Sequence, residues 1–282
     1  MSNGEPVEGA RRRVLVGVDG SDDGLRAVRY ALREALATDS DLWIVNVADA
    51  SALVGGLWDI VVPIDEIRQV GESFVNDALE VARTEGFPAE RVTTQVVPGH
   101  PAHVLAELSE QAGMLVMGRR SMSGLERMFV GSTSVAVAGR ARCPVVVISA
   151  SSTPERTGGH GVVAVAIGSL LAHSDALDWG VREAAVRKAR LRVVHVVPGD
   201  PGVGPSTYAA GTRALDERLG ALRGEHPDLV IESDLAAGAP IDELVARSRE
   251  VDLLILGVQP DRLSGLARGV LAHSSCPVGL TR

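Results

Sequence analysis

Short runs of apolar, mostly β-branched residues alternate along the chain with longer segments in which apolar residues recur every three or four positions. In the first half of the chain the short runs fall at residues 13–19, 41–49, 91–99, 114–118 and 144–149. The helical pattern occupies Asp22–Ala37, most of Val61–Glu85, the segment behind Pro101 and the segment from Gly131. Continuous apolar strands that alternate with amphipathic helices predict a parallel sheet covered on both faces, which is an α/β fold.

The second half of the chain repeats the pattern of the first. YALREAL at Tyr30 returns 149 residues later as WGVREAA, and LWIVNV at Leu42 returns at the same distance as LRVVHV. GHPAHVLAEL and MLVMG return 139 residues later as GAPIDELVAR and LLILG, and Cys-Pro-Val returns after 133 residues. Because the motifs keep their order, the chain consists of two copies of one unit, and the second copy is shorter in two places.

A polar linker separates the two copies. Residues Ser149–Gly161 read SASSTPERTGGHG, which is rich in Ser, Gly and Pro and has no apolar period. We therefore expect domains at about residues 1–152 and 160–282. Each domain should hold an open five-stranded parallel sheet, and the two should pack together as a pseudo-dimer.

Composition and charge exclude several classes of protein. Hydrophobic residues make up 45% of the chain and charged residues 23%, as in an average folded protein. The formal net charge is -8, and neither half is basic, which argues against a general nucleic-acid binder. The start of the sequence lacks the apolar core of a signal peptide, and no apolar run reaches the roughly 18 residues of a membrane span. We expect a cytoplasmic protein without membrane contact.

The lysine and cysteine counts exclude two further classes. The single lysine, Lys188, is followed by Ala189, whereas a P-loop needs Gly-Lys-Ser/Thr, so the chain is not a P-loop NTPase. Two cysteines, Cys143 and Cys276, cannot form a disulfide framework, and we expect both to be small buried core residues. His100 and His103 lie at a helix start without further ligands nearby in sequence, so we expect capping or exposure rather than a metal site.

Two segments of the first half carry candidate chemistry at the carboxyl ends of strands, where open α/β sheets bind ligands. The first is Asp19-Gly20-Ser21 after the first strand. The second is Gly118–Ser134, GRRSMSGLERMFVGSTS, after the fourth strand. Its glycines allow close approach of the backbone, its Ser132-Thr133-Ser134 run opens a helix whose free N–H groups favour anions, and Arg119, Arg120 and Arg127 add charge. These residues predict a site for a phosphate or similar anion.

The same motifs give the whole chain a resemblance to the universal stress protein family in its tandem form. They are the Asp-Gly-Ser turn, the Gly-x-Pro helix start, the strand–Gly–long loop–Gly-Ser helix and the closing Cys-Pro-Val strand. The resemblance implies a Rossmann-like, adenine-nucleotide α-hydrolase-like fold. ATP-binding members of that family carry Gly-x2-Gly-x9-Gly-Ser/Thr. Here Gly118, Ser121 and Gly131-Ser132 keep the spacing, with Ser121 in place of the middle glycine.

The resemblance also implies roles for single residues of the first half. Asp19 would bind the adenosine part of ATP, and the backbone of Val47 would meet adenine. Met117 and Gly118 would line the nucleotide. The phosphates would be held by Ser121, Gly131, Ser132 and Thr133. Mg²⁺ would accompany the phosphates, helped by Ser132 or held by the phosphates alone.

The second half departs from this pattern. Gly168 stands at the position of Asp19, and the segment after Gly257, VQPDRLSGLARG, is six residues shorter and lacks the glycine spacing. We therefore expect the second half not to bind ATP in the manner of the family.

Several functions remain open at this stage. The leading one is an ATP-binding stress-response sensor or regulator, in which nucleotide orders the Gly118–Gly131 loop and changes a surface for a protein partner that the sequence does not identify. The alternatives are a nucleotide-independent dimeric scaffold and a slow ATPase using Glu126, so enzymatic activity stays undecided. Asp19 could instead cap the helix from Asp22, and Arg119 could lie on a solvated loop. A homodimer through the last strand is compatible with the family, but the two halves could also satisfy that sheet edge internally.

Overall fold

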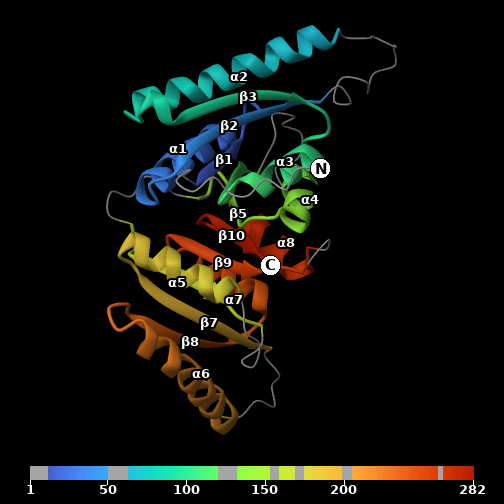
Figure 1. Ribbon diagram of the computed structural model, residues 1–282. Coiled ribbons are helices and arrows are strands. Elements are labelled where there is room, and N and C mark those ends of the chain that lie inside the picture. Colours follow the sequence, from blue (N-terminus) through green and yellow to red (C-terminus); the bar gives the residue numbers. More distant parts are fainter. Residues whose placement is uncertain are drawn as a thin grey trace, which may run out of the picture.

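The computed structural model describes residues 12–49, 63–119, 132–152, 159–168, 175–198, 205–259 and 263–282. The strands of this part form one sheet in the order β3-β2-β1-β4-β5-β10-β9-β6-β7-β8. Figure 1 shows the two halves stacked, blue to green above and yellow to red below, with β5 beside β10 at the middle. The α/β fold with two repeated units is confirmed.

The first half holds β1 (Arg13–Gly17), α1 (Asp22–Ala37), β2 (Asp41–Ala48), α2 (Ile64–Thr84), β3 (Val92–Pro98), α3 (Pro101–Leu108), β4 (Met114–Gly118), α4 (Ser132–Arg140) and β5 (Val145–Ile148). The second half holds β6 (Val162–Ala166), α5 (Asp175–Arg187), β7 (Arg190–Pro198), α6 (Pro205–Glu225), β8 (Ile231–Gly238), α7 (Pro240–Arg247), β9 (Leu253–Gly257), α8 (Gly265–His273) and β10 (Val278–Thr281). Short 3₁₀ turns, η2 (Ala89–Arg91) and η3 (Ser109–Gln111), precede β3 and follow α3.

The two five-stranded sheets are continuous rather than merely packed together. Each half is parallel within itself, whereas β5 and β10 pair antiparallel, with Val147 opposite Val278 and Val145 opposite Leu280. The edge that a last strand would offer to a second chain is therefore used within this chain. A dimer through β5 or β10 is not available to this structure, and the internal alternative left open by the sequence is the one observed.

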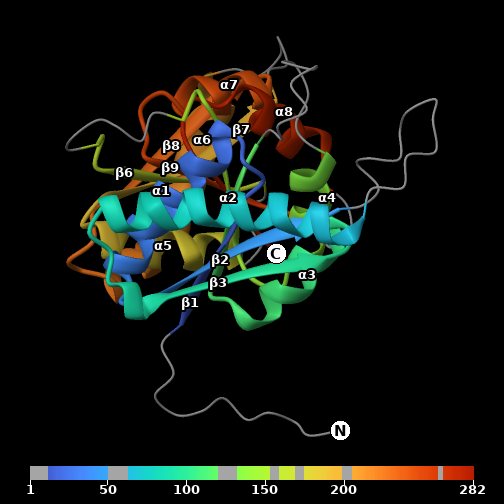
Figure 2. The ribbon, with the colours of Figure 1, turned by 90° about the horizontal axis from the view of Figure 1, so that it is seen from above.

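Helices cover both faces of the sheet. α1, α2, α5 and α6 pack on one face and α3, α4, α7 and α8 on the other. Figure 2 shows α1 and α5 together on one side and α4 and α8 together on the other. Successive strand residues alternate between the two cores, so Val14 and Val16 face the α1 side while Leu15, with no exposed surface, faces the α3 side. No helix of the described ranges is long and apolar enough to cross a membrane.

A buried serine fixes the last strand in both halves. The Ser109 hydroxyl donates to the Ala106 carbonyl and accepts from the Arg142 amide at 2.8 Å. In the second half Ser248 repeats this arrangement, donating to Val245 and accepting from the Ser275 amide at 2.9 Å. Each hydroxyl thus joins the end of a helix to the turn before the last strand. The second half keeps this contact although it is shorter than the first.

A charged cluster on the α1–α5 side crosses the boundary between the halves. Arg187 donates to Glu34 at 2.6 Å, to the Tyr30 hydroxyl at 2.8 Å and to Glu183. Glu34 and Glu183 are 3% and 5% exposed, and they occupy equivalent positions, 149 residues apart, in α1 and α5. One guanidinium therefore compensates two buried carboxylates that the duplication brings together.

The opposite side carries two reciprocal helix caps. Arg119 of the first half donates to the carbonyls of Leu271 and Ala272 in the last turn of α8, at 3.1 and 2.7 Å. Arg282 of the second half donates to the Gly139 carbonyl in the last turn of α4, at 2.8 Å. Carbonyls at a helix C-terminus attract cations, so each half closes the last helix of the other.

Removal of the Arg187 side chain should destabilise the folded chain strongly. Arg187→Ala leaves Glu34 and Glu183 buried without their guanidinium, and loss of one partner of a buried pair costs about 3 kcal/mol or more. Urea unfolding followed by circular dichroism measures this. The control is Arg190→Ala, since Arg190 is 48% exposed in its pair with Glu232 and such a pair contributes about 0–1 kcal/mol. Equal losses in the two variants would contradict the assignment of Arg187 to the boundary.

Candidate nucleotide site

The Asp-Gly-Ser turn after β1 is held in place from β2. The Val18 amide donates to the Val45 carbonyl at 2.9 Å, and the buried Asn46 side chain donates to the Val18 carbonyl at 2.8 Å. Gly20 follows with φ +77°, and a Cβ there would lie 2.4 Å from the Phe74 ring. Glycine is therefore required at this point both by backbone conformation and by space.

Asp19 positions the helix cap without being the cap. Its Oδ1 accepts from the Ser21 amide at 3.1 Å and from the Ser21 hydroxyl at 2.5 Å. The Ser21 hydroxyl in turn accepts from the Gly24 amide, which makes Ser21 the N-cap of α1. Asp19 is half-buried, and its Oδ2 has no partner within the described ranges. The turn thus presents a fixed carboxylate oxygen that can accept a hydrogen bond.

The end of β4 lies directly against the first turn of α1. A Cβ on Gly118 would lie 2.8 Å from the Asp23 carbonyl carbon and 2.9 Å from the Gly24 nitrogen. A Cβ on Gly24 would in turn lie 3.1 Å from Asp19 Oδ1. These contacts bring Gly118 and Asp19 to the same place, as the sequence predicted from the strand ends, and they require residues without side chains between the two elements.

The start of α4 joins the same edge. The Ser134 hydroxyl donates to the carbonyls of Gly118 and Arg119 at 3.2 and 3.4 Å, which ties the first turn of α4 to the end of β4. Thr133 is half-buried in that turn, Met117 is buried beside Gly118, and Val47 is half-buried near the end of β2. Five of the eight predicted site residues therefore lie at the ends of β1, β2 and β4 or at the start of α4.

The remaining three predicted residues fall at the limits of the described chain. Ser121 and Gly131 lie outside the described residues, as do Arg120, Glu126 and Arg127. The backbone of Ser132 begins α4, while its side chain is not described. The phosphate-binding part of the prediction accordingly remains a prediction, whereas Ser134 shows how the start of α4 is anchored.

Arg119 was wrongly expected to supply charge to the anion loop or to lie on a solvated surface. It is 6% exposed, and its guanidinium reaches across the boundary to the carbonyls at the end of α8. The physical reason is that those helix-end carbonyls carry negative partial charge and need donors. No local pattern around Arg119 indicates that it belongs to the contact between the halves.

Asn46 is a positioning residue that the sequence reasoning missed. A polar residue interrupts the apolar run LWIVNV, and the second copy has His195 in the same place in LRVVHV. His195 Nδ1 lies 3.0 Å from the Ile167 carbonyl, so it repeats the contact that Asn46 makes with Val18. A polar residue at the same position of two buried strands is the sequence pattern that would have indicated this role.

The equivalent edge of the second half lacks the carboxylate and, among the described residues, the close glycine contacts. Gly168 stands where Asp19 would be, and a Cβ there would meet no described residue within 4 Å. Of the described residues, a Cβ on Gly257, the counterpart of Gly118, would meet only Ala176, at 3.9 Å. The second half therefore keeps the strands and helices of the site but not its close contacts.

The described residues contain no group of three metal-ligating side chains. His100 precedes α3 without a side-chain cap, and His103 lies 3.1 Å from Glu107 on an exposed face. Cys276 is buried and Cys143 half-buried. Burial raises the pKa of each thiol to about 12, so neither is a nucleophile at neutral pH.

Comparisons with known proteins agree with this architecture. The model of the universal stress protein family matches residues 10–149 and again residues 161–282. Universal stress protein Rv2623 of Mycobacterium tuberculosis is 26% identical over 268 residues, covering 91% of this chain and 88% of that protein. Universal stress protein Rv2005c of the same species is 29% identical over 262 residues, covering 86% of each. The crystal structure of a universal stress protein from Archaeoglobus fulgidus superposes with a TM-score of 0.71 at 19% identity, covering 96% of both chains.

Gly118→Ala should destabilise the first half, whereas Gly257→Ala should not. The new Cβ at residue 118 meets backbone atoms at 2.8 and 2.9 Å, and overpacking of this kind costs about 1–3 kcal/mol. At residue 257 the contact of 3.9 Å is ordinary, so we expect a change of at most about 0.5 kcal/mol. Thermal unfolding of both variants measures the difference. Equal stabilities would contradict the close contact between β4 and α1.

Both thiols should resist thiol reagents in the folded protein. The pKa of a cysteine in an unfolded chain is about 8.5, whereas burial raises the pKa of both cysteines to about 12 in the folded protein. The native state therefore binds more protons above about pH 8.5, and the free energy of unfolding should decrease as pH rises from there toward 12. Ellman's reagent at pH 8 should label neither cysteine before urea is added and both afterwards. Rapid labelling of the native protein would contradict this prediction.

Proposed function

Since the chain belongs to the universal stress protein family through both of its halves, we propose that its first half binds ATP and that the protein acts as a nucleotide-dependent regulator in a stress response. The observation that supports this most directly is the contact of Asp19, Gly24 and Gly118. This contact brings a carboxylate oxygen of Asp19 close to Gly118 at the end of β4. The first turn of α4 is bound to the same strand end, so all three lie at one edge of the sheet.

Asp19 is suited to the adenosine part of the nucleotide. Ser21 holds its Oδ1, so the direction of the carboxylate is set before a ligand arrives and Oδ2 can accept from a ribose hydroxyl. The backbone of Val47, at the end of the neighbouring strand, would meet adenine, and Met117 would supply apolar contact. The donor and acceptor types present at this edge fit a nucleoside.

The start of α4 is suited to the phosphates. Its free N–H groups and positive dipole end face the same edge as Gly118, because Ser134 binds this turn to the end of β4. Ser121, Gly131, Ser132 and Thr133 would add backbone N–H groups and hydroxyls. Mg²⁺ would be held mainly by the phosphates themselves, with at most the Ser132 hydroxyl from the protein.

The second half is proposed to have lost this function. Gly168 takes the place of the Asp19 carboxylate. Among the described residues, a Cβ on Gly257 of β9 would make only an ordinary contact with α5, whereas a Cβ on Gly118 of β4 would clash with α1. A nucleotide-independent scaffold is the competing function, and the continuous sheet that joins the halves favours it as a second candidate. Nucleotide binding separates the two proposals.

Titration calorimetry of the full chain with ATP and Mg²⁺ should give about one ATP per chain, since only one half carries the site. Asp19→Ala should abolish this binding or weaken it by about 1.5–3 kcal/mol, because it removes a charged acceptor. Asp22→Ala is the matched control, since Asp22 is an exposed residue of the same helix start. We expect that variant to bind as the unchanged protein does.

Other stoichiometries would change the proposal in defined ways. Two ATP per chain would contradict the loss of the second site. An absence of binding with and without Mg²⁺ would overturn the regulator and leave the scaffold. Release of ADP in proportion to protein would support the slow ATPase instead.

A further inference from the structure

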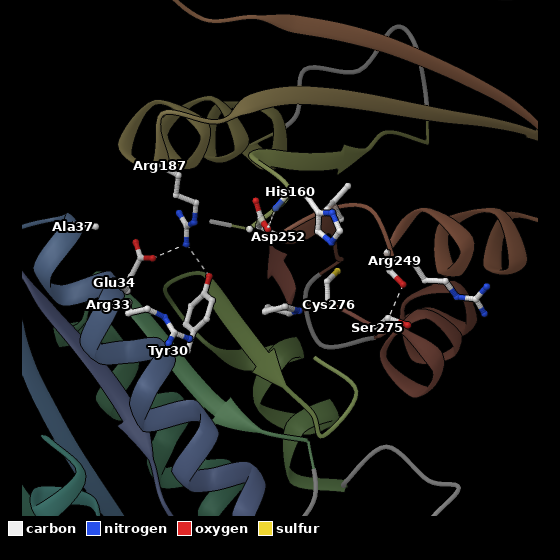
Figure 3. Close-up of a pocket in the computed structure, with 14 residues that line it drawn as sticks. Tyr30, Arg33, Glu34, Ala37, His160, Arg187, Arg249, Asp252, Ser275 and Cys276 are labelled. Carbon is white, nitrogen blue, oxygen red and sulfur yellow. Dashed lines mark hydrogen bonds and ion pairs between the residues drawn. The ribbon is translucent and has the colours of Figure 1, made fainter. Parts of the chain in front are cut away.

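A cavity of about 450 Å³ lies between the two halves (Figure 3). We call it the boundary cavity. One wall is the latter part of α1, and the other is formed by residues that directly precede β6, β9 and β10. Its chemically relevant lining residues are Tyr30, Arg33, Glu34, His160, Arg187 and Asp252. None of the residues proposed for ATP lines it, and its volume is that of a small-molecule site.

Glu34 is one of the lining residues of the cavity, and it carries an unsatisfied acceptor oxygen. Its Oε2 accepts from Arg187 at 2.6 Å, whereas its Oε1 is buried and has no hydrogen-bond partner among the residues that the structure describes. Figure 3 shows the Glu34 carboxylate between α1 and Arg187, with one oxygen on the dashed line to the guanidinium. A buried carboxylate oxygen without a donor costs free energy, and a ligand N–H group in the cavity would remove that cost.

The missing partner is specific to the first half. The equivalent carboxylate, Glu183, accepts from the Trp179 indole at 2.7 Å through Oε1 and from Arg187 through Oε2. The residue at the position of Trp179 in α1 is Tyr30, which accepts from Arg187 and makes no such bond to Glu34. The two carboxylates also share one guanidinium, so the cluster has an excess of negative charge. Both features favour a positively charged N–H donor beside Glu34.

Positive and donor groups lie elsewhere on the same cavity. Arg33 has no hydrogen bond or ion pair within the described ranges. Burial raises the pKa of Tyr30 to about 12, although the nearby positive charge of Arg33 lowers it. The Tyr30 hydroxyl therefore stays protonated at neutral pH and can donate a hydrogen bond. The His160 ring adds a further N–H group. The Asp252 carboxylate, by contrast, is occupied by the amides of His160 and Val162 at 2.7 and 3.1 Å.

We propose that the boundary cavity binds a small metabolite that carries both an amino group and an acid group, as free amino acids do. The amino group donates to Glu34 Oε1, and the acid group accepts from Arg33, with Tyr30 and His160 as further donors. Because the lining residues come from both halves, this ligand stabilises their contact. The site is independent of the proposed ATP site and does not rest on it.

The first test uses free amino acids as probes of the full-length protein. Each is added singly and its binding is followed by ligand-observed NMR. We expect at least one to bind with a Kd near or below about 1 mM. Two analogues of that amino acid, one lacking the amino group and one lacking the carboxyl group, should each bind at least about tenfold more weakly. Absence of binding by every amino acid, or equal binding of either analogue, would overturn the proposal.

The second test uses variants matched by the repeat. Glu34→Gln and Arg33→Gln should each weaken binding at least about tenfold. Arg182→Gln is the control for Arg33, because Arg182 is the exposed equivalent in α5. Glu183→Gln is the control for Glu34, because it alters the same Arg187 cluster from a residue that is not among those lining the cavity. Neither control should change the affinity.

The outcomes distinguish direct contact from indirect effects. An equal loss in Glu34→Gln and Glu183→Gln would show that a disturbed cluster, not a ligand contact, changes the affinity, and would overturn the assignment. Unchanged binding in Arg33→Gln would also overturn it, and this exposed residue can be replaced without loss of the fold. Asp19→Ala should leave amino-acid binding unchanged, so failure here and failure of the ATP proposal are separate results.

Discussion

The antiparallel pairing of β5 with β10 constrains the rest of the molecule. Three residue pairs, centred on Val146 and Gly279, convert two parallel sheets into one and leave neither last strand with a free edge. The pairing also fixes which helices meet, because equivalent faces of the two units then lie on the same side. α1 approaches α5 on one side and α4 approaches α8 on the other (Figure 2). Since one chain carries both copies, the partner strand is present at high effective concentration.

The contacts on the two sides of this junction follow from the duplication but are not symmetric. Equivalent glutamates meet near the boundary, where two like charges would repel, and Arg187 compensates both. The position of Arg187 in the first copy is held by Thr38, so the first copy has no guanidinium equivalent to that of Arg187. Trp179 satisfies the second oxygen of Glu183, whereas Tyr30 leaves that of Glu34 without a donor. The asymmetry of three side chains thus accounts for the unsatisfied oxygen in the boundary cavity.

The duplicated unit has kept the contacts that maintain its shape and changed those proposed to bind nucleotide. Ser109 and Ser248 make the same two hydrogen bonds in the two halves. Asn46 and His195, although they are different residues, contact the equivalent backbone carbonyls of Val18 and Ile167. Gly118 is pressed against α1, whereas its counterpart Gly257 has ordinary space around it. A contact needed by the sheet persists in both copies because each copy must bury its own strands. The contacts proposed to bind nucleotide are not needed to bury the strands, so one copy can lose them and keep its fold.

The sequence by itself determined the strands, the helices and the duplication, because hydrophobic periodicity and repeat spacing are local properties of the chain. It also placed Asp19 and Gly118 together, because carboxyl ends of neighbouring parallel strands meet at one edge, whereas Val47 and Met117 were implied only by the resemblance to the family. Tertiary structure alone decided that Arg119 binds the end of α8 and that Arg187 compensates Glu34 and Glu183. These contacts join residues up to 153 positions apart, and the pairing of β5 with β10, which brings the two halves together, leaves no periodic trace in either segment.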